Sequence, residues 1–259
     1  VVMFIGVVFA LAAGLMWGLI FVGPLLVPDY PAALQSTGRY LAFGLITLPL
    51  AWFDRRRLRK LRRQDWLEAL KLTAIGNLLY YLCLASAIQR TGAPVSTMII
   101  GTLPVVIAIC ANLFYGRHDG RLAWSKLAPA LLLIVCGLAC VNIAELRGNA
   151  VPIDGWRYLS GLGLAALAVA CWTWFPLRNS RWLRDNPTQR PATWATAQGL
   201  VTLPLALLGY LAVCGQLALS EPAFALPFGP RPEVFIPLML VIGVFCSWLG
   251  ALCWNEASQ

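Results

Sequence analysis

The sequence has few charged residues and a single histidine. Only 12% of its 259 residues are Asp, Glu, Lys or Arg, whereas 59% are hydrophobic. An ordinary soluble domain carries about 25% charged residues, so this chain has too little polar surface to form one. A mean hydropathy of +0.73 extends that conclusion to the whole length. We therefore expect an all-α membrane protein with many spans.

Patterns that signal catalysis or a bound metal are also missing. The lone His118 lies in a GRHDGR loop, and neither an HExxH pattern nor a nucleophile elbow occurs. None of the eight cysteines belongs to a CxxC pair. An intramembrane protease would need an acid pair or a Ser/His pair at membrane depth. We expect no enzyme activity and no cofactor or metal.

Acidic residues are absent from the interior of the apolar segments. The eleven Asp and Glu residues fall in loops or at segment ends, and only Glu256 could be drawn into a helix end. Proton-coupled pumps usually need a carboxylate at membrane depth whose pKa can be shifted. For a transporter, this absence favours facilitated movement that is not coupled to protons.

The sequence does contain a nearly continuous series of apolar segments. A helix needs about 20 apolar residues to cross the ~30 Å hydrocarbon core of a bilayer. The segments predict eight transmembrane helices, at residues 2–26, 31–53, 66–89, 95–115, 122–143, 158–177, 191–214 and 234–259.

The basic residues gather in short loops on one side of these helices. Loop 54–65 carries seven basic residues and loop 178–190 carries four. The net charge of +9 therefore follows the positive-inside rule and is not the footprint of a nucleic-acid-binding protein. This places the N-terminus in the cytoplasm.

Two distant stretches of the chain are nearly identical. GLITLPLA at 44–51 and GLVTLPLA at 199–206 share seven of eight residues at an offset of 155. The same offset matches the first segment to the sixth along one helical face, ending on Trp17 and Trp172. The copies lie in the second and seventh segments, an offset of five, and because five is odd the second copy crosses the membrane in the opposite direction. An inverted repeat of five-helix units is typical of secondary transporters.

A third match defines the limits of the repeat. Residues 79–89 align with 249–259 at an offset of 170, which pairs the third segment with the eighth. Partners for the fourth and fifth segments are not in this chain. We therefore expect a full protein of ten helices, about eight of them here. Residues 1–143 would be the first repeat, 144–157 the connecting loop and 158–259 an incomplete second repeat of three helices.

Polar and aromatic side chains inside the apolar segments are candidates for a substrate cavity, because polar groups are costly at membrane depth. The duplicated tryptophans are expected on opposite sides of a central site, bordering the cavity. Alternatively, Ser and Thr bond their own helix backbone, and Trp and Tyr anchor at the interface. The substrate-binding candidates are Trp17, Asn77, Tyr80, Tyr81, Thr102, Trp172 and Trp248.

Arg39 is the one basic residue near the start of the second segment. It is a candidate contact for a carboxylate or phosphate on the substrate, or it snorkels to the interface. Its counterpart in the second copy is Trp194, so the charge is not part of the duplicated core. Pro49 and Pro204 are matched points at which the helices can bend.

Several short motifs carry a family resemblance. They are AAGLMWGLIFV at 12–22, the Arg39 region, SAIQRTGAPVSTMIIGTLPVV at 86–106, CGLACV at 136–141 and WTWF at 172–175. With these the chain resembles the drug/metabolite transporter (DMT) superfamily, specifically its EamA-type exporters, and most of all the bacterial aromatic-amino-acid exporters. The resemblance implies ten helices in two inverted repeats around a central cavity, with Tyr80 and Trp172 as cavity aromatics.

The sequence departs from that pattern in two places. Arg117 and His118 replace a glutamate after the fourth segment, and Gly101, Thr102 and Leu103 stand where the aromatic exporters can have aromatic residues. These differences leave the substrate open. The small multidrug pumps of the same superfamily rely on an acidic residue in their first helix. The first segment here has no such residue, which argues against proton-driven cation efflux.

The combined prediction is an inner-membrane exporter of amino acids, aromatic and other neutral ones, or of similar small metabolites, working by alternating access. Its partners would be the small-molecule substrate and membrane lipid, with a monomer as one possible assembly. A sugar-phosphate or nucleotide-sugar carrier is an alternative, although it would want paired basic residues at depth. A membrane-embedded lipid-handling protein is another. The direction of transport rests on the resemblance alone.

Overall fold

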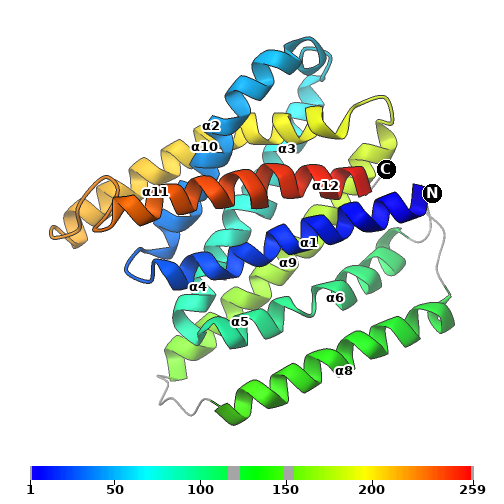
Figure 1. The fold of residues 1–259 in the computed structure, drawn as a ribbon, viewed down its shortest axis with the longest axis horizontal. Helices are drawn as coiled ribbons and strands as arrows, with labels where there is room; N and C mark the ends of the chain where they lie inside the picture. The colour runs from blue at the N-terminus through cyan, green and yellow to red at the C-terminus, as the bar shows by residue number, and fades with distance from the viewer. Residues whose placement is uncertain (1, 116–122, 149–154, 258–259) are drawn as a thin grey trace.

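The computed structural model describes residues 2–115, 123–148 and 155–257, and it contains no β-strand within these ranges. Five of the eight helical segments described here are continuous (Figure 1), and four of them are α1 (Val2–Leu26), α2 (Ala32–Leu58), α8 (Trp124–Gly148) and α9 (Gly155–Asp185). A fifth continuous helix, α10, covers Pro191–Ser220.

The remaining three segments are built from shorter pieces. The third consists of α3 (Arg63–Thr73), the π-helical η1 (Ala74–Leu79) and α4 (Tyr80–Thr91). The fourth consists of α5 (Ala93–Ile100), α6 (Leu103–Cys110) and the π-helical η2 (Ala111–Tyr115). The eighth consists of α11 (Pro232–Val241), the π-helical η3 (Ile242–Leu249) and α12 (Gly250–Ala257).

The prediction of an all-α membrane protein is confirmed. Six segments within the described residues are long and apolar enough to cross a membrane. The second segment is not among them, because its apolar middle lies between the charged stretch 54–57 at its end and polar residues at its start. The polar residues at the start, Gln35, Ser36 and Arg39, are nevertheless buried inside the protein, each with no more than 2% of its surface exposed. Burial against other helices, and not apolar composition, is what allows α2 to lie at membrane depth.

Three predicted helix ends were too early. We expected ends at residues 53, 177 and 214, but α2 continues to Leu58, α9 to Asp185 and α10 to Ser220. Hydropathy marks where a helix leaves the hydrocarbon, whereas the backbone hydrogen bonds continue into water. The stretch from Arg178 to Asp185, which we expected to be a loop, is therefore the last part of α9.

The two copies of the repeated stretch pack directly against each other where α2 crosses α10. Gly44 in α2 faces Leu203 in α10, and Gly199 in α10 faces Thr47 in α2. A Cβ atom on Gly44 would lie 2.8 Å from the Cα of Leu203. The absence of a side chain is therefore what lets these two backbones approach, as small residues do in other membrane helix pairs.

The outer helices are exchanged between the two halves of the chain. α1 packs against η3 and α12, while α9 packs against α4 and η1. Figure 1 shows α1 running beside the α11–α12 segment, with α8 at the edge of the molecule next to α6. The first helix of each proposed repeat therefore packs against the third helix of the other repeat.

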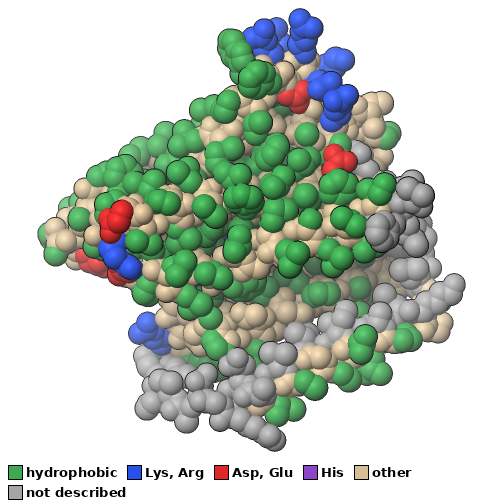
Figure 2. All heavy atoms as spheres, viewed as in Figure 1, with side chains coloured by type: hydrophobic (Ala, Val, Ile, Leu, Met, Phe, Trp, Pro, Cys, Tyr) green, Lys and Arg blue, Asp and Glu red, His purple; other side chains and the backbone are tan. Residues whose placement is uncertain are grey.

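The surface separates into a wide apolar face and a basic end. Large side chains such as Leu15, Phe53 and Leu133 are mostly exposed, as suits contact with lipid. Figure 2 shows Lys and Arg gathered beyond the apolar face, over the end of α2 and the start of α3. This distribution is the one that the positive-inside rule describes.

We predict that Gly44→Ala destabilises the protein by about 1–3 kcal/mol, the usual cost of overpacking a close contact. The added methyl would meet the Leu203 backbone, which cannot rotate away. The melting temperature of the purified protein in detergent measures the loss. Gly163→Ala in α9 is the matched control, because nothing lies within 4 Å of its Cβ position. Equal melting temperatures for the two variants would contradict this account of the α2–α10 contact.

Candidate functional site

The duplicated tryptophans meet at the centre of the molecule. The rings of Trp17 and Trp172 are 5.2 Å apart, edge to face. Trp172 also stacks on Tyr80 and Phe175 at 4.7 and 5.1 Å, and Trp17 lies 5.5 Å from Trp254. We call these five rings the aromatic cluster. Our expectation that Trp17 and Trp172 lie on opposite sides of a cavity was wrong, because the exchanged helices α1 and α9 converge here.

Trp17 is fixed by a hydrogen bond to a π-helical segment. Its indole N–H donates to the carbonyl oxygen of Cys246 in η3, at 2.9 Å. The π-helical segments η1 and η3 overlap at the offset of 170 that relates the third segment to the eighth. Such turns are rare and are frequently found at functional sites. Hydropathy and residue spacing did not predict these π-helical turns.

An apolar pocket of about 330 Å³ lies on one side of the aromatic cluster. It is bounded by α1, α4, α9 and the broken fourth segment, where α5 ends and α6 begins. Its volume is at the lower end of the range for small-molecule sites. Its larger lining residues are Trp17, Phe21, Tyr80, Ile100, Pro104 and Trp172. We call it the aromatic pocket.

A small polar chamber lies on the other side. Its volume of about 10 Å³ leaves room for about one water molecule. Trp17 and Trp172 line this chamber as well as the aromatic pocket, so their contact separates the two. The polar side chains of the chamber are Arg39, Asn77, Gln198, Ser247 and Asn255.

Four of the seven substrate-binding candidates border these two cavities: Trp17, Asn77, Tyr80 and Trp172. The other three do not line either cavity. Thr102 donates its hydroxyl to the carbonyl of Ile99 at 2.6 Å, the backbone-bonding alternative. Tyr81 is fully buried, and Trp248 packs at the edge of the main hydrophobic core.

Arg39 does not snorkel to an interface. Only 2% of its surface is exposed, and its Nε donates to the hydroxyl of Ser247 at 3.1 Å. The guanidinium also lies over the rings of Tyr40 and Tyr81, at 4.9 and 4.5 Å. Contacts of this kind favour a cation in a desolvated place. The position of Tyr81 beside Arg39 explains why it is buried and does not face the aromatic pocket.

A buried amide network supports the chamber from α9 and α10. Asn179 accepts hydrogen bonds from the Trp194 indole and the Gln198 amide, both at 2.8 Å. Its own amide donates to Oδ1 of Asn255 at 2.7 Å. Sequence reasoning missed Asn179 because it was assigned to a loop. Gln198 directly precedes the repeated stretch, and its polarity within an apolar segment was the signal that could have found it.

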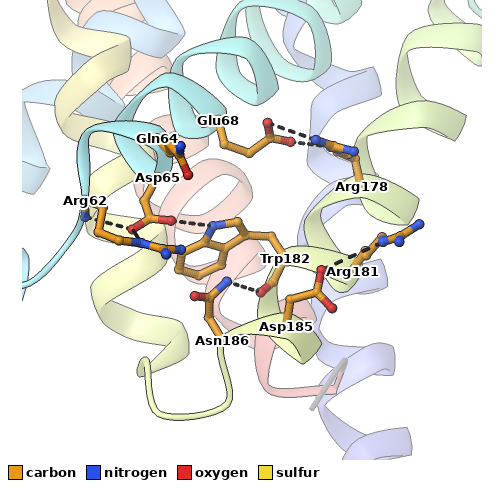
Figure 3. Close-up of a pocket in the computed structure, with 9 residues that line it drawn as sticks. All are labelled: Arg62, Gln64, Asp65, Glu68, Arg178, Arg181, Trp182, Asp185 and Asn186. Carbon is orange, nitrogen blue, oxygen red and sulfur yellow. Dashed lines mark hydrogen bonds and ion pairs between the residues drawn. The ribbon is translucent and has the colours of Figure 1, made fainter.

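A second polar pocket, of about 270 Å³, lies at the basic end of the molecule (Figure 3). Its charged residues are paired with one another. Glu68 accepts hydrogen bonds from Arg178, Asp65 accepts one from the indole of Trp182 at 3.2 Å, and Arg181 pairs with Asp185. The contacts of Glu68 and Asp65 join α3 to α9, whereas the Arg181–Asp185 pair lies within α9. Their mutual pairing makes this pocket a contact between two helices and not a substrate site.

The opposite end is held by a second ion pair. Arg231, before α11, donates to both carboxylate oxygens of Asp29 in the turn between α1 and α2. The neighbouring Tyr30 hydroxyl donates to the carbonyl of Phe228 and accepts from the backbone N–H of Arg231. Hydrogen bonding to Arg231 lowers the pKa of Asp29 from its usual value. We call this contact the outer clasp.

Comparison with known proteins agrees with the family resemblance described above. A model of the EamA-like transporter family matches residues 4–143. The chain is 67% identical to inner membrane protein YtfF of Escherichia coli (strain K12), over 98% of this chain and 79% of that protein. It is 26% identical to uncharacterized transporter YetK of Bacillus subtilis (strain 168), over 52% of this chain and 39% of that one.

A solved crystal structure has the same fold as this chain. The two superimpose with a TM-score of 0.67, and the matched region covers 100% of this chain and 78% of the chain in the crystal structure. At 16% sequence identity this likeness concerns the fold alone. Arg117 and His118, which entered the sequence analysis, lie outside the described residues.

The outer clasp predicts a pH-dependent stability difference. Asp29→Asn removes the ion pair and lowers the melting temperature slightly at pH 7. The folded pKa of Asp29 is depressed, so its contribution is present above the unfolded pKa of about 3.9 and is lost as the pH falls through the lower folded value. The melting temperatures of wild type and variant therefore converge below about pH 4. A difference that does not change with pH would contradict the clasp.

Proposed function

The chain belongs to the EamA-like transporter family and is a multi-pass protein of the inner membrane, and we propose that it exports amino acids or similar small metabolites by alternating access. The observation that carries this proposal is the aromatic cluster. Its rings come from the first and third helices of both halves of the chain, and its two tryptophans separate an apolar pocket from a polar chamber. A site between two halves is where alternating access requires a substrate to bind.

The exchanged packing supports the inverted repeat on which this mechanism depends. α1 lies on the eighth segment and α9 on the third, and α2 crosses α10 at the repeated stretch. Related π-helical segments occur in the third and eighth segments. Two halves built alike and oriented oppositely can exchange conformations, so that the central site opens to each side in turn.

Ion pairs join helices at both ends of the molecule. The basic end is joined by the Glu68–Arg178 ion pair, and the other end by the Asp29–Arg231 pair of the outer clasp. Each pair is partly exposed, so it costs little to break. Weak contacts at both ends suit a transporter, because one end must open while the other stays closed.

The cavities also favour transport without proton coupling. No Asp or Glu is among the residues that line the aromatic pocket or the polar chamber within the described part of the chain. A proton-coupled exporter needs a group there that changes its charge. We propose facilitated movement of neutral amino acids, aromatic ones included, down their gradient.

We predict that Trp17→Ala and Trp172→Ala each reduce the flux of labelled L-phenylalanine through proteoliposomes by about tenfold or more. A buried aromatic side chain contributes about 1.5–3 kcal/mol, and each 1.4 kcal/mol is a factor of ten. Trp52→Ala is the matched control, because Trp52 is exposed at the end of α2 and contacts Arg55. Wild-type flux in both cavity variants would refute the role of the aromatic cluster. Collapsing the pH gradient should leave wild-type flux unchanged.

A further inference from the structure

We propose that the polar chamber is a carboxylate-binding subsite, in which Arg39 and Asn255 hold the anionic end of the substrate while its apolar part occupies the aromatic pocket. This inference rests on the proposed transport function and names the substrate class: small carboxylates with an apolar body. Three observations support this proposal: the charge of Arg39, the orientation of Asn255, and the position of the chamber beside the aromatic pocket.

Arg39 is a buried cation without a counter-charge. None of the ion pairs within the described ranges involves it. The ionisable groups that act on it are the phenols of Tyr40, Tyr80 and Tyr81 and the thiol of Cys246, which are neutral near pH 7. Its Nη1 is buried without a hydrogen-bond partner. A charge at membrane depth is costly and tends to mark a substrate path, so an anion is the missing partner.

The orientation of Asn255 follows from a chain of hydrogen bonds that can run in only one direction. The indole of Trp194 is a donor and never an acceptor, so the Asn179 atom facing it must be the carbonyl oxygen. The Asn179 amide nitrogen then donates to Asn255, which must present its own oxygen. The Asn255 nitrogen is left over, buried without a partner, in a residue that lines the chamber.

The chamber therefore offers two unpartnered donors, one of them charged. Arg39 Nη1 and Asn255 Nδ2 both belong to residues that line the same small space, which has room for about one water. Ser247 already accepts from Arg39, which leaves its own hydrogen to donate. A carboxylate is an acceptor with two oxygens and one negative charge, and it matches this set. A phosphate carries more oxygens and charge than one cation can balance.

The rest of the substrate is defined by what lies next to the chamber. Trp17 and Trp172 line both cavities, so a molecule whose carboxylate reaches Arg39 places its other end in the aromatic pocket. That pocket is bounded by aromatic and aliphatic side chains. The chamber is too small for a carboxylate while the two rings touch. Binding therefore requires that the Trp17–Trp172 contact open.

The test compares acids with their amides in equilibrium binding to the purified protein, measured by tryptophan fluorescence. The probes are 3-phenylpropanoate, 3-phenylpropanamide and phenyl phosphate. We expect the acid to bind about 10- to 100-fold more tightly than the amide, the usual range for a hydrogen bond to a charged group. Phenyl phosphate should bind no better than the amide. Equal binding of acid and amide, no binding of the acid, or preference for the phosphate would overturn the proposal.

Arg39→Gln should abolish the preference for the acid over the amide. Arg55→Gln is the matched control: Arg55 also lies over an aromatic ring, that of Trp52 at 4.7 Å, but at the exposed end of α2. A purely structural Arg39 would change the melting temperature and leave the acid-to-amide ratio as in wild type, which would overturn the subsite. Binding is measured without transport, so failure of the proposed function, an absence of flux, is a separate result.

Asn255→Asp provides a second test that does not remove the buried charge. It places a carboxylate inside the chamber, where it should pair with Arg39 in place of the substrate. We expect a higher melting temperature than wild type and a loss of 3-phenylpropanoate binding of tenfold or more. A variant that binds the acid as wild type does would show that the chamber does not hold the carboxylate.

Discussion

The close contact between α2 and α10 is the constraint on which the rest of the structure depends. The two copies of the repeated stretch cross there, and Gly44 and Gly199 allow the backbones to approach. Lipid tails offer no hydrophobic driving force between helices, so such packing and internal hydrogen bonds must hold the helices together. With α2 and α10 fixed, α1 and α9 reach across to the opposite halves of the chain. Trp17 and Trp172 meet as a consequence.

The same constraint explains how so many polar groups are tolerated at the centre. Arg39 comes from α2, Gln198 from α10, and both lie close to the crossing, where protein and not lipid surrounds them. Asn179 and Asn255 complete a network that satisfies most of its own hydrogen bonds. The exceptions, Arg39 Nη1 and Asn255 Nδ2, occur in the chamber beside the aromatic pocket. Polar groups that remain unsatisfied at such a place point to a ligand.

Much of the fold could be predicted from the sequence, because hydropathy and internal repetition report directly on membrane spans. The eight segments, the pairing of Trp17 with Trp172 and the pairing of the third with the eighth segment all came from such patterns. The distances between the paired residues could not be predicted in this way. A repeat relates two residues by symmetry, but it does not say whether they lie apart or touch. Trp17 and Trp172 touch because α1 and α9 converge. Asn179 and Trp248 show the same limit: polarity alone does not tell which side of a helix meets a cavity.

The central claim is that this chain carries small solutes across the membrane. Its most direct test is counterflow in proteoliposomes that contain the full chain and are loaded with unlabelled L-phenylalanine. The account predicts a transient accumulation of external labelled L-phenylalanine that is unaffected by collapsing the pH gradient. Uptake no faster than in protein-free liposomes, for L-phenylalanine and for other neutral amino acids alike, would contradict it.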